Sequence, residues 1–293
     1  MDFGIHTFVW NDGQTQQDIE QAMEMTRETG FAILELPGLD PRAFDLDRLV
    51  RRAVELEIRL AASAGLTPAH DVTSEDPEVV RRGEMFLLEA VGVARDLGST
   101  QMSGPIFSAH QKFPTMPTRE GWKRSAEVLA RVAETAKDAG VALCLELVNR
   151  YETNLINTVQ QGLAYIEESG SDNIFLHLDT FHMNIEEADP VQAIRLAGDR
   201  IGYFHVGESN RGYLGSGTVD FEATFDALLE IGYSRGISIE AFNSRTCRDH
   251  LKTVCAIWRD VFHDDVDFAL HSKVFLDMQY AAAQRRAGAY APA

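Results

Sequence analysis

Short apolar runs alternate with amphipathic helical stretches along nearly the whole chain, and this alternation limits the possible folds more than any other feature. The apolar runs have the length of strands, whereas the stretches between them repeat with the period of a helix. Strands that alternate with helices are joined by crossovers and therefore lie parallel. The predicted strands are Phe3–Val9, Ala32–Leu36, Arg59–Ala64, Thr100–Gly104, Val141–Leu147, Ile174–Asp179, Ile201–Val206 and Gly236–Phe242. The clearest predicted helices are Gln16–Thr29, Glu78–Leu97, Thr118–Ala139, Val159–Ser169 and Phe221–Ile231.

Several predicted helices are followed by a glycine directly before the next strand. These glycines are Gly30, Gly98, Gly140, Gly170 and Gly232. Glycine suits the left-handed position that closes a helix, because it has no Cβ to clash there. About eight strand–helix units can be counted, which is the number that closes a barrel. We therefore predict an α/β fold, a (β/α)8 TIM barrel. The alternative, a doubly wound open sheet, is less well supported because no glycine-rich phosphate loop follows the first strand.

The length of 293 residues fits one barrel domain without a linker. We expect residues 1–284 to form the barrel with an extra C-terminal helix, and residues 285–293 to form a disordered tail. The segment Ser103–Pro117 contains three prolines and reads as a long loop after the fourth strand. Long loops at that end of a barrel usually shape the active site.

The charge balance narrows the possible partners. The net charge of −18 disfavours nucleic acid and anionic membrane surfaces, because both repel an acidic chain. No apolar segment reaches the ~18–20 residues that span a bilayer, and the N-terminus lacks the pattern of a secretory signal. Cys144, Cys247 and Cys255 form no CxxC pair, so they are read as free thiols. These features predict a cytoplasmic protein with a neutral or cationic partner.

Four consecutive predicted strands each end in a potential metal ligand. These residues are Glu146, Asp179, His205 and Glu240. In a (β/α)8 barrel, the C-terminal strand ends meet at the face that carries the active site. Any one of these side chains could be a helix cap or a salt-bridge partner. Because the pattern recurs on four consecutive strands, a shared site is the better explanation.

Strand alternation places these side chains inside the barrel. If Glu146 faces inward, Cys144 and Ala142 do so as well, and Glu240 likewise takes Ser238 inward. Carboxylates that converge in a barrel repel one another unless a cation lies between them. Three oxygen ligands and one nitrogen suit a divalent metal, and we favour Mn²⁺, with Mg²⁺ or Co²⁺ as alternatives.

The strand ends lie in longer strings that resemble the ketose 3-epimerases, the D-tagatose and D-allulose (psicose) 3-epimerase family of the xylose-isomerase-like TIM barrels. The resembling strings are Gly4–His6, Ser103–Ser108, Leu145–Glu152 with Asn157-Thr158, His177–Glu187 and His205–Gly217. The resemblance covers essentially the whole chain. The chain departs from the family's pattern at Ser103 and after Glu240, which leaves the preferred sugar open.

The resemblance implies a role for each matching residue. Glu146, Asp179, His205 and Glu240 would bind the metal, and Glu146 and Glu240 would also be the catalytic acid and base. Three further residues would bind the hydroxyls and the carbonyl oxygen of a ketose substrate. They are Glu152, His182 and Arg211. The resemblance also implies a homodimer or homotetramer.

Residues near the first strand are further substrate-binding candidates. His6 faces the barrel interior with Gly4 and Phe8, so it is either a core histidine or part of the pocket wall. Phe8 and Trp10 are candidates for an apolar wall, or are ordinary core aromatics. The other histidines are assigned to the surface or to loops; they are His70, His110, His250, His263 and His271.

The segment beyond Leu251 contains apolar residues with two possible uses. It either supplies a contact surface between copies of the chain or packs back on the barrel. The residues concerned are Ile257, Trp258, Val261 and Phe262.

Two glutamates on opposite sides of a bound ketose would remove and return the C3 proton through an enediolate that the metal stabilises. This predicts metal-dependent epimerisation of free ketoses at C3. A sugar isomerase, or the catalytic subunit of a complex that cleaves C-glycosides of 3-keto sugars, is an alternative on the same fold. A non-catalytic sugar-binding barrel would be expected to have lost one glutamate. A DNA-cleaving endonuclease of this fold would need a basic face.

Overall fold

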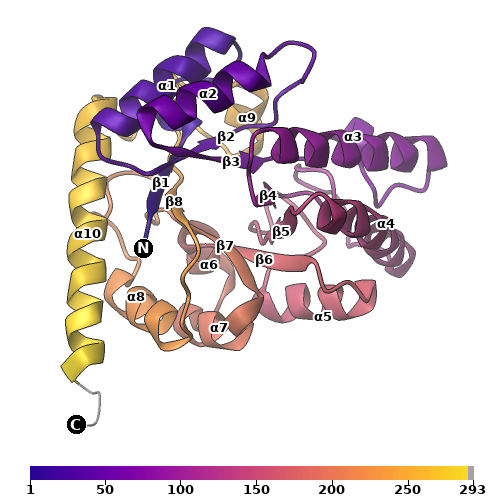
Figure 1. Cartoon of the computed structure of the whole chain (residues 1–293). Helices are drawn as coiled ribbons and strands as arrows, with labels where there is room; N and C mark the ends of the chain where they lie inside the picture. The colour runs from indigo at the N-terminus through magenta and orange to yellow at the C-terminus, as the bar shows by residue number, and fades with distance from the viewer. Residues whose placement is uncertain (290–293) are drawn as a thin grey trace.

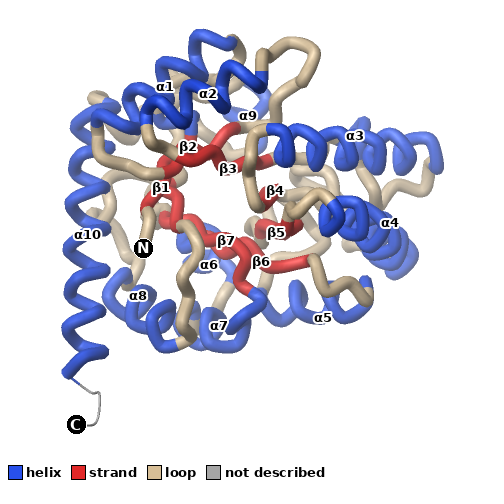
Figure 2. The backbone as a smooth tube through the Cα atoms, in the orientation of Figure 1, coloured by secondary structure: helices blue, strands red, loops and turns tan. Residues whose placement is uncertain are grey.

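The computed structural model describes residues 1–289 and shows a closed barrel of eight parallel strands in sequence order (Figure 2). This confirms the predicted (β/α)8 fold and excludes the open sheet. The strands are β1 (Phe3–His6), β2 (Ile33–Leu36), β3 (Arg59–Ser63), β4 (Gln101–Gly104), β5 (Ala142–Glu146), β6 (Ile174–Asp179), β7 (Ile201–Val206) and β8 (Ile237–Ile239).

Helices surround the barrel and connect successive strands (Figure 1). The α-helices are α1 (Gln16–Glu28), α2 (Leu46–Leu56), α3 (Pro77–Asp96), α4 (Arg119–Asp138), α5 (Val159–Ser169), α6 (Thr180–Glu186), α7 (Pro190–Ala197), α8 (Phe221–Glu230), α9 (Asp249–Val254) and α10 (Asp265–Ala289). The 3-10 helices are η1 (Thr7–Val9), η2 (Pro68–His70) and η3 (Gly198–Arg200).

Local sequence signals explain where these helices begin and end. Thr15 and Thr158 each start a helix with a capping box, which satisfies backbone N–H groups of the first turn. The five predicted helix-closing glycines all have positive φ angles between 67° and 83°. That backbone region is the one for which the absence of a Cβ matters.

The strand register brings the ends of neighbouring strands to one level. Asp179 pairs with His205 across β6 and β7, and His205 pairs with Ser238 across β7 and β8. Inside the barrel, Cys144 packs with Tyr203 and with apolar side chains from β2 and β3. The inward orientation expected for Cys144, and hence for Glu146, is therefore confirmed.

Two strands are shorter than expected. β1 ends at His6 because the Nδ1 atom of His6 accepts a hydrogen bond from the backbone N–H of Phe8 and starts η1. β8 ends at Ile239, directly before Glu240. Glu240 still donates its backbone N–H to the carbonyl oxygen of Val206, which keeps it next to β7.

The C-terminal helix is longer than expected. α10 packs beside α8 and β1 and continues to Ala289, five residues into the segment expected to be a disordered tail (Figure 1). The guanidinium of Arg286 donates to both carboxylate oxygens of Asp226 at 2.8–3.0 Å and so fixes the last turns against α8. The expectation of a tail is thus wrong for residues 285–289, and residues 290–293 lie outside the described residues.

Part of the segment beyond Leu251 packs back on the barrel, which is one of its two expected uses. Ile257 and Phe262 are buried and pack back on the molecule, whereas Trp258 is 71% exposed. None of the helices within residues 1–289 combines the length and apolarity needed to cross a membrane.

Candidate active site

Four strand-end side chains converge inside the mouth of the barrel. The Nδ1 atom of His205 lies 3.9 Å from Glu146 Oε1, from Asp179 Oδ2 and from Glu240 Oε1. All four potential ligand atoms lie within 4.8 Å of one another. The structure therefore brings together the four residues that the sequence predicts as metal ligands.

Two buried polar atoms in this group are suited to bind a cation. Asp179 Oδ2 and His205 Nδ1 are fully buried and have no hydrogen-bond partner among the described residues. Buried polar atoms normally have partners, and a divalent cation would satisfy both at once. The set of three carboxylates and one imidazole nitrogen fits such an ion.

Burial also perturbs the acid–base behaviour of the two glutamates. Burial, followed by the charge of Glu240, raises the pKa of Glu146 well above its ordinary value. Burial raises the pKa of Glu240 to about 7, against the opposing charges of His205 and Arg211. Such shifts mark groups that can exchange protons near neutral pH.

Glu35 on β2 belongs to this site, although the sequence analysis did not single it out. Its Oε2 atom accepts hydrogen bonds from His205 Nε2 at 2.7 Å and from the Tyr203 hydroxyl at 3.0 Å. Burial alone would raise the pKa of Glu35, but the charge and hydrogen bond of His205 lower it to about 2. The sequence did contain a sign of this role, because Glu35 is the one charged residue in the otherwise apolar run Ile33–Leu36.

His182, Asn149 and Glu152 form a second polar group beside the first. The backbone N–H of Asn149 donates to His182 Nδ1 at 3.1 Å, so the proton of this neutral imidazole lies on Nε2. Nε2 lies 3.7 Å from Glu146 Oε1. The side chain of Asn149 donates to Glu152 Oε1 at 2.8 Å. The structure thus places His182 and Glu152, two predicted substrate-binding residues, at the cavity wall.

Arg211, the third of these residues, is fixed from several sides. Its guanidinium lies 4.0 Å from the ring centre of Phe181 and 4.6 Å from that of Phe242. Its NH1 atom donates to Glu240 Oε2 at 3.1 Å. Arg211 also has a left-handed backbone, with φ of 57°, which a non-glycine residue adopts only when its surroundings impose it.

Glu208 imposes this loop conformation. Its buried carboxylate accepts hydrogen bonds from the backbone N–H groups of Ser209, Gly215 and Val219. A Cβ on Gly217 would lie 2.3 Å from Glu208 Oε1, so only glycine leaves room for this carboxylate.

His6 and Phe8 both line the cavity and stack on each other with ring centres 4.4 Å apart. His6 Nε2 lies 4.0 Å from Glu35 Oε1. Trp10 differs from Phe8, because it packs in the main core and donates its indole N–H to Thr26.

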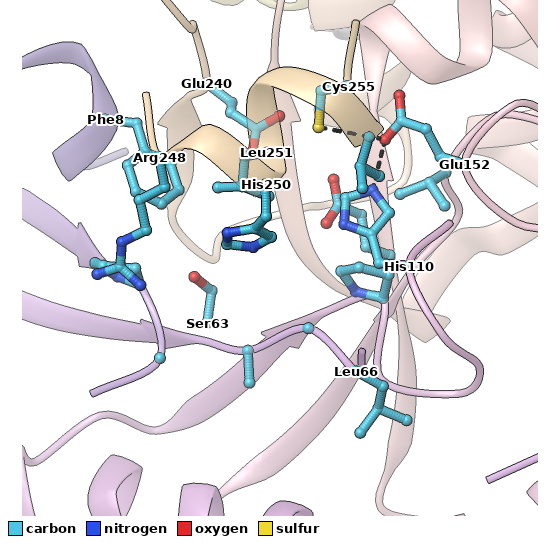
Figure 3. A pocket seen from close by; sticks show the side chains of 18 of the residues that line it. Phe8, Ser63, Leu66, His110, Glu152, Glu240, Arg248, His250, Leu251 and Cys255 are labelled. Atoms are coloured by element: carbon cyan, nitrogen blue, oxygen red, sulfur yellow. Dashed lines mark hydrogen bonds and ion pairs between the residues drawn. The ribbon is translucent and has the colours of Figure 1, made fainter. Parts of the chain in front are cut away.

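The cavity has a volume of about 610 Å³, and three of the four strand-end residues, Glu146, His205 and Glu240, line it. Figure 3 shows Phe8 and Arg248 at one end, Glu152 and Cys255 at the other, and Glu240 between them. Three wall residues come from segments that the sequence analysis did not connect with the site. They are His110 in the loop after β4, and His250 and Cys255 in and after α9.

Comparison with known proteins places this chain in a family. Residues 23–262 match the family model described as xylose isomerase-like TIM barrel. The chain is 48% identical to an L-ribulose 3-epimerase of Mesorhizobium japonicum, over 97% of this chain and 96% of the relative. It is 41% identical to a ketose 3-epimerase of Arthrobacter globiformis, over 94% of this chain and 96% of the relative.

A solved structure gives the same result. The D-allulose 3-epimerase of a Methylomonas species, in complex with D-allulose, superposes with a TM-score of 0.92 at 39% identity. The match covers 96% of this chain and 97% of the other. The chain therefore belongs to the ketose 3-epimerases of the xylose isomerase-like TIM barrel family.

Proposed function

We propose that this protein is a metal-dependent enzyme that epimerises free ketoses at C3, with substrates of the ribulose, D-allulose/D-fructose or D-tagatose type. One observation carries the proposal: two glutamates with raised pKa values, Glu146 and Glu240, converge with Asp179 and His205. The names of the similar epimerases support the same reaction class.

Glu146, Asp179, His205 and Glu240 would bind the metal, and Mn²⁺ is the best match, with Mg²⁺ or Co²⁺ as alternatives. When bound, the metal supplies a Lewis acid that stabilises the negative charge of an enediolate. Glu35 holds the imidazole of His205 through Nε2, so that Nδ1 faces the other three ligands.

Epimerisation at C3 requires proton removal on one face of the sugar and proton return on the other. One of the two glutamates accepts the C3 proton and the other donates one from the opposite side. Burial raises the pKa of both groups, which favours their holding a proton and so suits them to exchange one with the sugar. After one turnover the two protonation states have exchanged, which suits a reversible reaction.

The remaining polar groups would orient the sugar. His182 presents the N–H of Nε2 toward Glu146, where it can donate to a substrate oxygen. Arg211 provides a fixed positive charge beside Glu240, and Glu152 accepts from substrate hydroxyls. His6 and Phe8 form a flat wall against which the carbon chain of the sugar can lie.

Purified protein stripped of metal and reloaded with Mn²⁺ tests this function directly. We expect it to convert D-fructose to D-allulose, or a ribulose to its C3 epimer, without another protein. Inactivity of the lone reloaded chain on all of these ketoses would contradict the proposal and favour a two-subunit enzyme.

The expected cytoplasmic location and homo-oligomeric assembly are part of the same proposal. An apolar stripe on α10 supports self-association. It consists of Val266, Leu270, Val274 and Met278, which repeat every fourth residue and are 38–66% exposed. Such a stripe is costly to leave in water on a lone chain.

A further inference from the structure

Beside the four strand ends, a thiol, an imidazole and a carboxylate meet at one end of the cavity. They belong to Cys255, His110 and Glu152 (Figure 3). His110 Nε2 lies 2.7 Å and Cys255 Sγ lies 3.7 Å from the same oxygen, Glu152 Oε2. All three candidate ligand atoms lie within 4.8 Å of one another and border the cavity.

We propose that Cys255, His110 and Glu152 form a second metal site, which takes a thiophilic divalent cation such as Zn²⁺. Sulfur, imidazole nitrogen and carboxylate oxygen are the three ligand types of tetrahedral zinc sites. Bond lengths of about 2.0–2.3 Å give ligand-to-ligand separations of about 3.3–3.6 Å in such a site. The sulfur–oxygen distance is already close to this value, and the nitrogen–oxygen distance has to open by about half an ångström.

The charges of the cluster suit a doubly charged ion. Although burial alone would raise it, the pKa of Glu152 is lowered by the groups around it, including the hydrogen bond from His110 and the charge of Arg211, so this carboxylate is ionised. Burial and then the charge of Glu152 raise the pKa of the Cys255 thiol, so an entering cation must displace its proton to solvent. Thiolate and carboxylate then balance the two positive charges. Arg211 faces the other oxygen of Glu152, Oε1, at 3.9 Å.

Binding also requires a proton shift on His110. Its Nε2 atom now donates to the ionised Glu152, so in the metal-bound form the proton has to lie on Nδ1. No electron is transferred, and the thiol proton is the only one released. Metal affinity should therefore rise with pH by about tenfold per pH unit below the thiol pKa.

The three ligands come from separate segments, so a bound ion would link these segments to one another. His110 lies in the loop after β4, Glu152 in the loop after β5, and Cys255 directly after α9. A shared ion would tie α9 to the barrel rim over the cavity. Since Glu152 is also a proposed sugar contact, the ion would inhibit the epimerase; this consequence, unlike the site itself, rests on the proposed function.

Cadmium binding provides a direct test, because thiolate–cadmium bonds absorb in the ultraviolet and the strand-end site has only oxygen and nitrogen ligands. Protein preloaded with saturating Mn²⁺ is titrated with Cd²⁺. Wild-type protein should develop the charge-transfer band and saturate at one Cd²⁺ per chain. Cys255→Ser should develop none. The matched control is Cys247→Ser, which removes a buried thiol nearby and should leave the band unchanged.

Two further measurements test whether His110 is a ligand and whether Cys255, not Cys247, binds the ion. His110→Gln should weaken Cd²⁺ binding at least tenfold while retaining the band. Bound Cd²⁺ should protect Cys255, and not Cys247, from alkylation as read by peptide mass spectrometry. A wild-type protein without the band, or a Cys255→Ser variant with an undiminished band, would overturn the proposal.

Inhibition is measured separately, so that failure of the proposed function is distinguishable from failure of the site. At saturating Mn²⁺, Cys255→Ser should need at least tenfold more Zn²⁺ than wild type for half-inhibition, each relative to its own zinc-free rate. Equal sensitivity of the two proteins would refute the inhibitory role. A protein that shows the cadmium band but epimerises no ketose would retain the site and lose the function.

Discussion

The carboxylate of Glu35 on β2 accepts a 2.7 Å hydrogen bond from Nε2 of His205 on β7, three strands away around the barrel. This bond determines which imidazole nitrogen faces the other strand ends, because Nε2 is occupied and Nδ1 is left to bind either a proton or a metal ion. A carboxylate behind a ligating histidine also increases the basicity of the histidine. Glu35 thus acts on the proposed metal through His205 without touching it.

Replacing Glu35 with glutamine should weaken metal binding. The variant keeps an oxygen acceptor but loses its negative charge, so we expect Mn²⁺ affinity to fall by about 10- to 100-fold. The rate at saturating Mn²⁺ should fall much less. Mn²⁺ titration followed by electron paramagnetic resonance measures the affinity. The control is Tyr203→Phe, which removes the other hydrogen bond to Glu35 and should have the smaller effect. An unchanged affinity in Glu35→Gln would show that this contact does not support the metal.

The metal-free protein should lose stability as the pH rises above neutrality. Burial alone would lower the pKa of His205, but the charge and hydrogen bond of Glu35 raise it to about 10, from 6.5 in an unfolded chain. Protonated His205 therefore stabilises the fold fully below pH 6.5, and this contribution is lost progressively between pH 6.5 and 10.

Urea unfolding at pH 7, 8 and 9 measures this effect. The free energy of unfolding of the metal-free protein should fall by up to about 1 kcal/mol per pH unit. Saturating Mn²⁺ should remove the slope, because the metal replaces the proton on Nδ1. A free energy that rises over this range without metal would contradict the assignment.

Arg211 should not be replaceable by lysine. The guanidinium stacks between Phe181 and Phe242 and donates to Glu240, and a lysine ammonium cannot reproduce this planar fit. We expect kcat/KM of Arg211→Lys to fall roughly 10- to 100-fold. Arg245→Lys is the control, since its ion pairs with Asp260 and Asp265 are partly exposed and worth little. Activity of Arg211→Lys within twofold of wild type would rule out the positioning role.

The exposed stripe on α10 should lie in a contact between copies of the chain. Val274→Asp places a charge in the middle of the stripe, where Val274 is 58% exposed, and should dissociate the expected dimer or tetramer. Val54→Asp is the matched control, because Val54 is 73% exposed on the separate helix α2. Sedimentation velocity separates the outcomes. The same assembly in wild type and Val274→Asp would place the interface elsewhere.

The sequence predicted those parts of the molecule that repeat along the chain. Strand periodicity and helix-closing glycines recur along the chain, so the barrel could be derived from them. The same pattern predicts that four side chains lie together at the C-terminal strand ends; they are Glu146, Asp179, His205 and Glu240. Cys144 lies inward as alternation requires, because a strand has only two faces.

The features that were missed depend on contacts between distant segments. The contact of Glu35 with His205 crosses the barrel, and Cys255 meets His110 only because α9 folds over the cavity. The end of α10 depends on the pairing of Arg286 with Asp226, which are 60 residues apart. Local patterns carry no information about such pairings. The one exception is Glu35, because a charged residue within an apolar strand indicates a buried polar partner.

Hydrogen exchange at individual sugar carbons tests the central claim, that Glu146 and Glu240 move the C3 proton. Mn²⁺-loaded protein is incubated in D₂O with D-fructose, D-tagatose or a ribulose, and deuterium is located by nuclear magnetic resonance. We predict deuterium at C3 and none at C1, with no epimerisation by Glu146→Gln or Glu240→Gln. Deuterium at C1 alone would show an aldose–ketose isomerase instead, and epimerisation by either variant would refute the role of that glutamate.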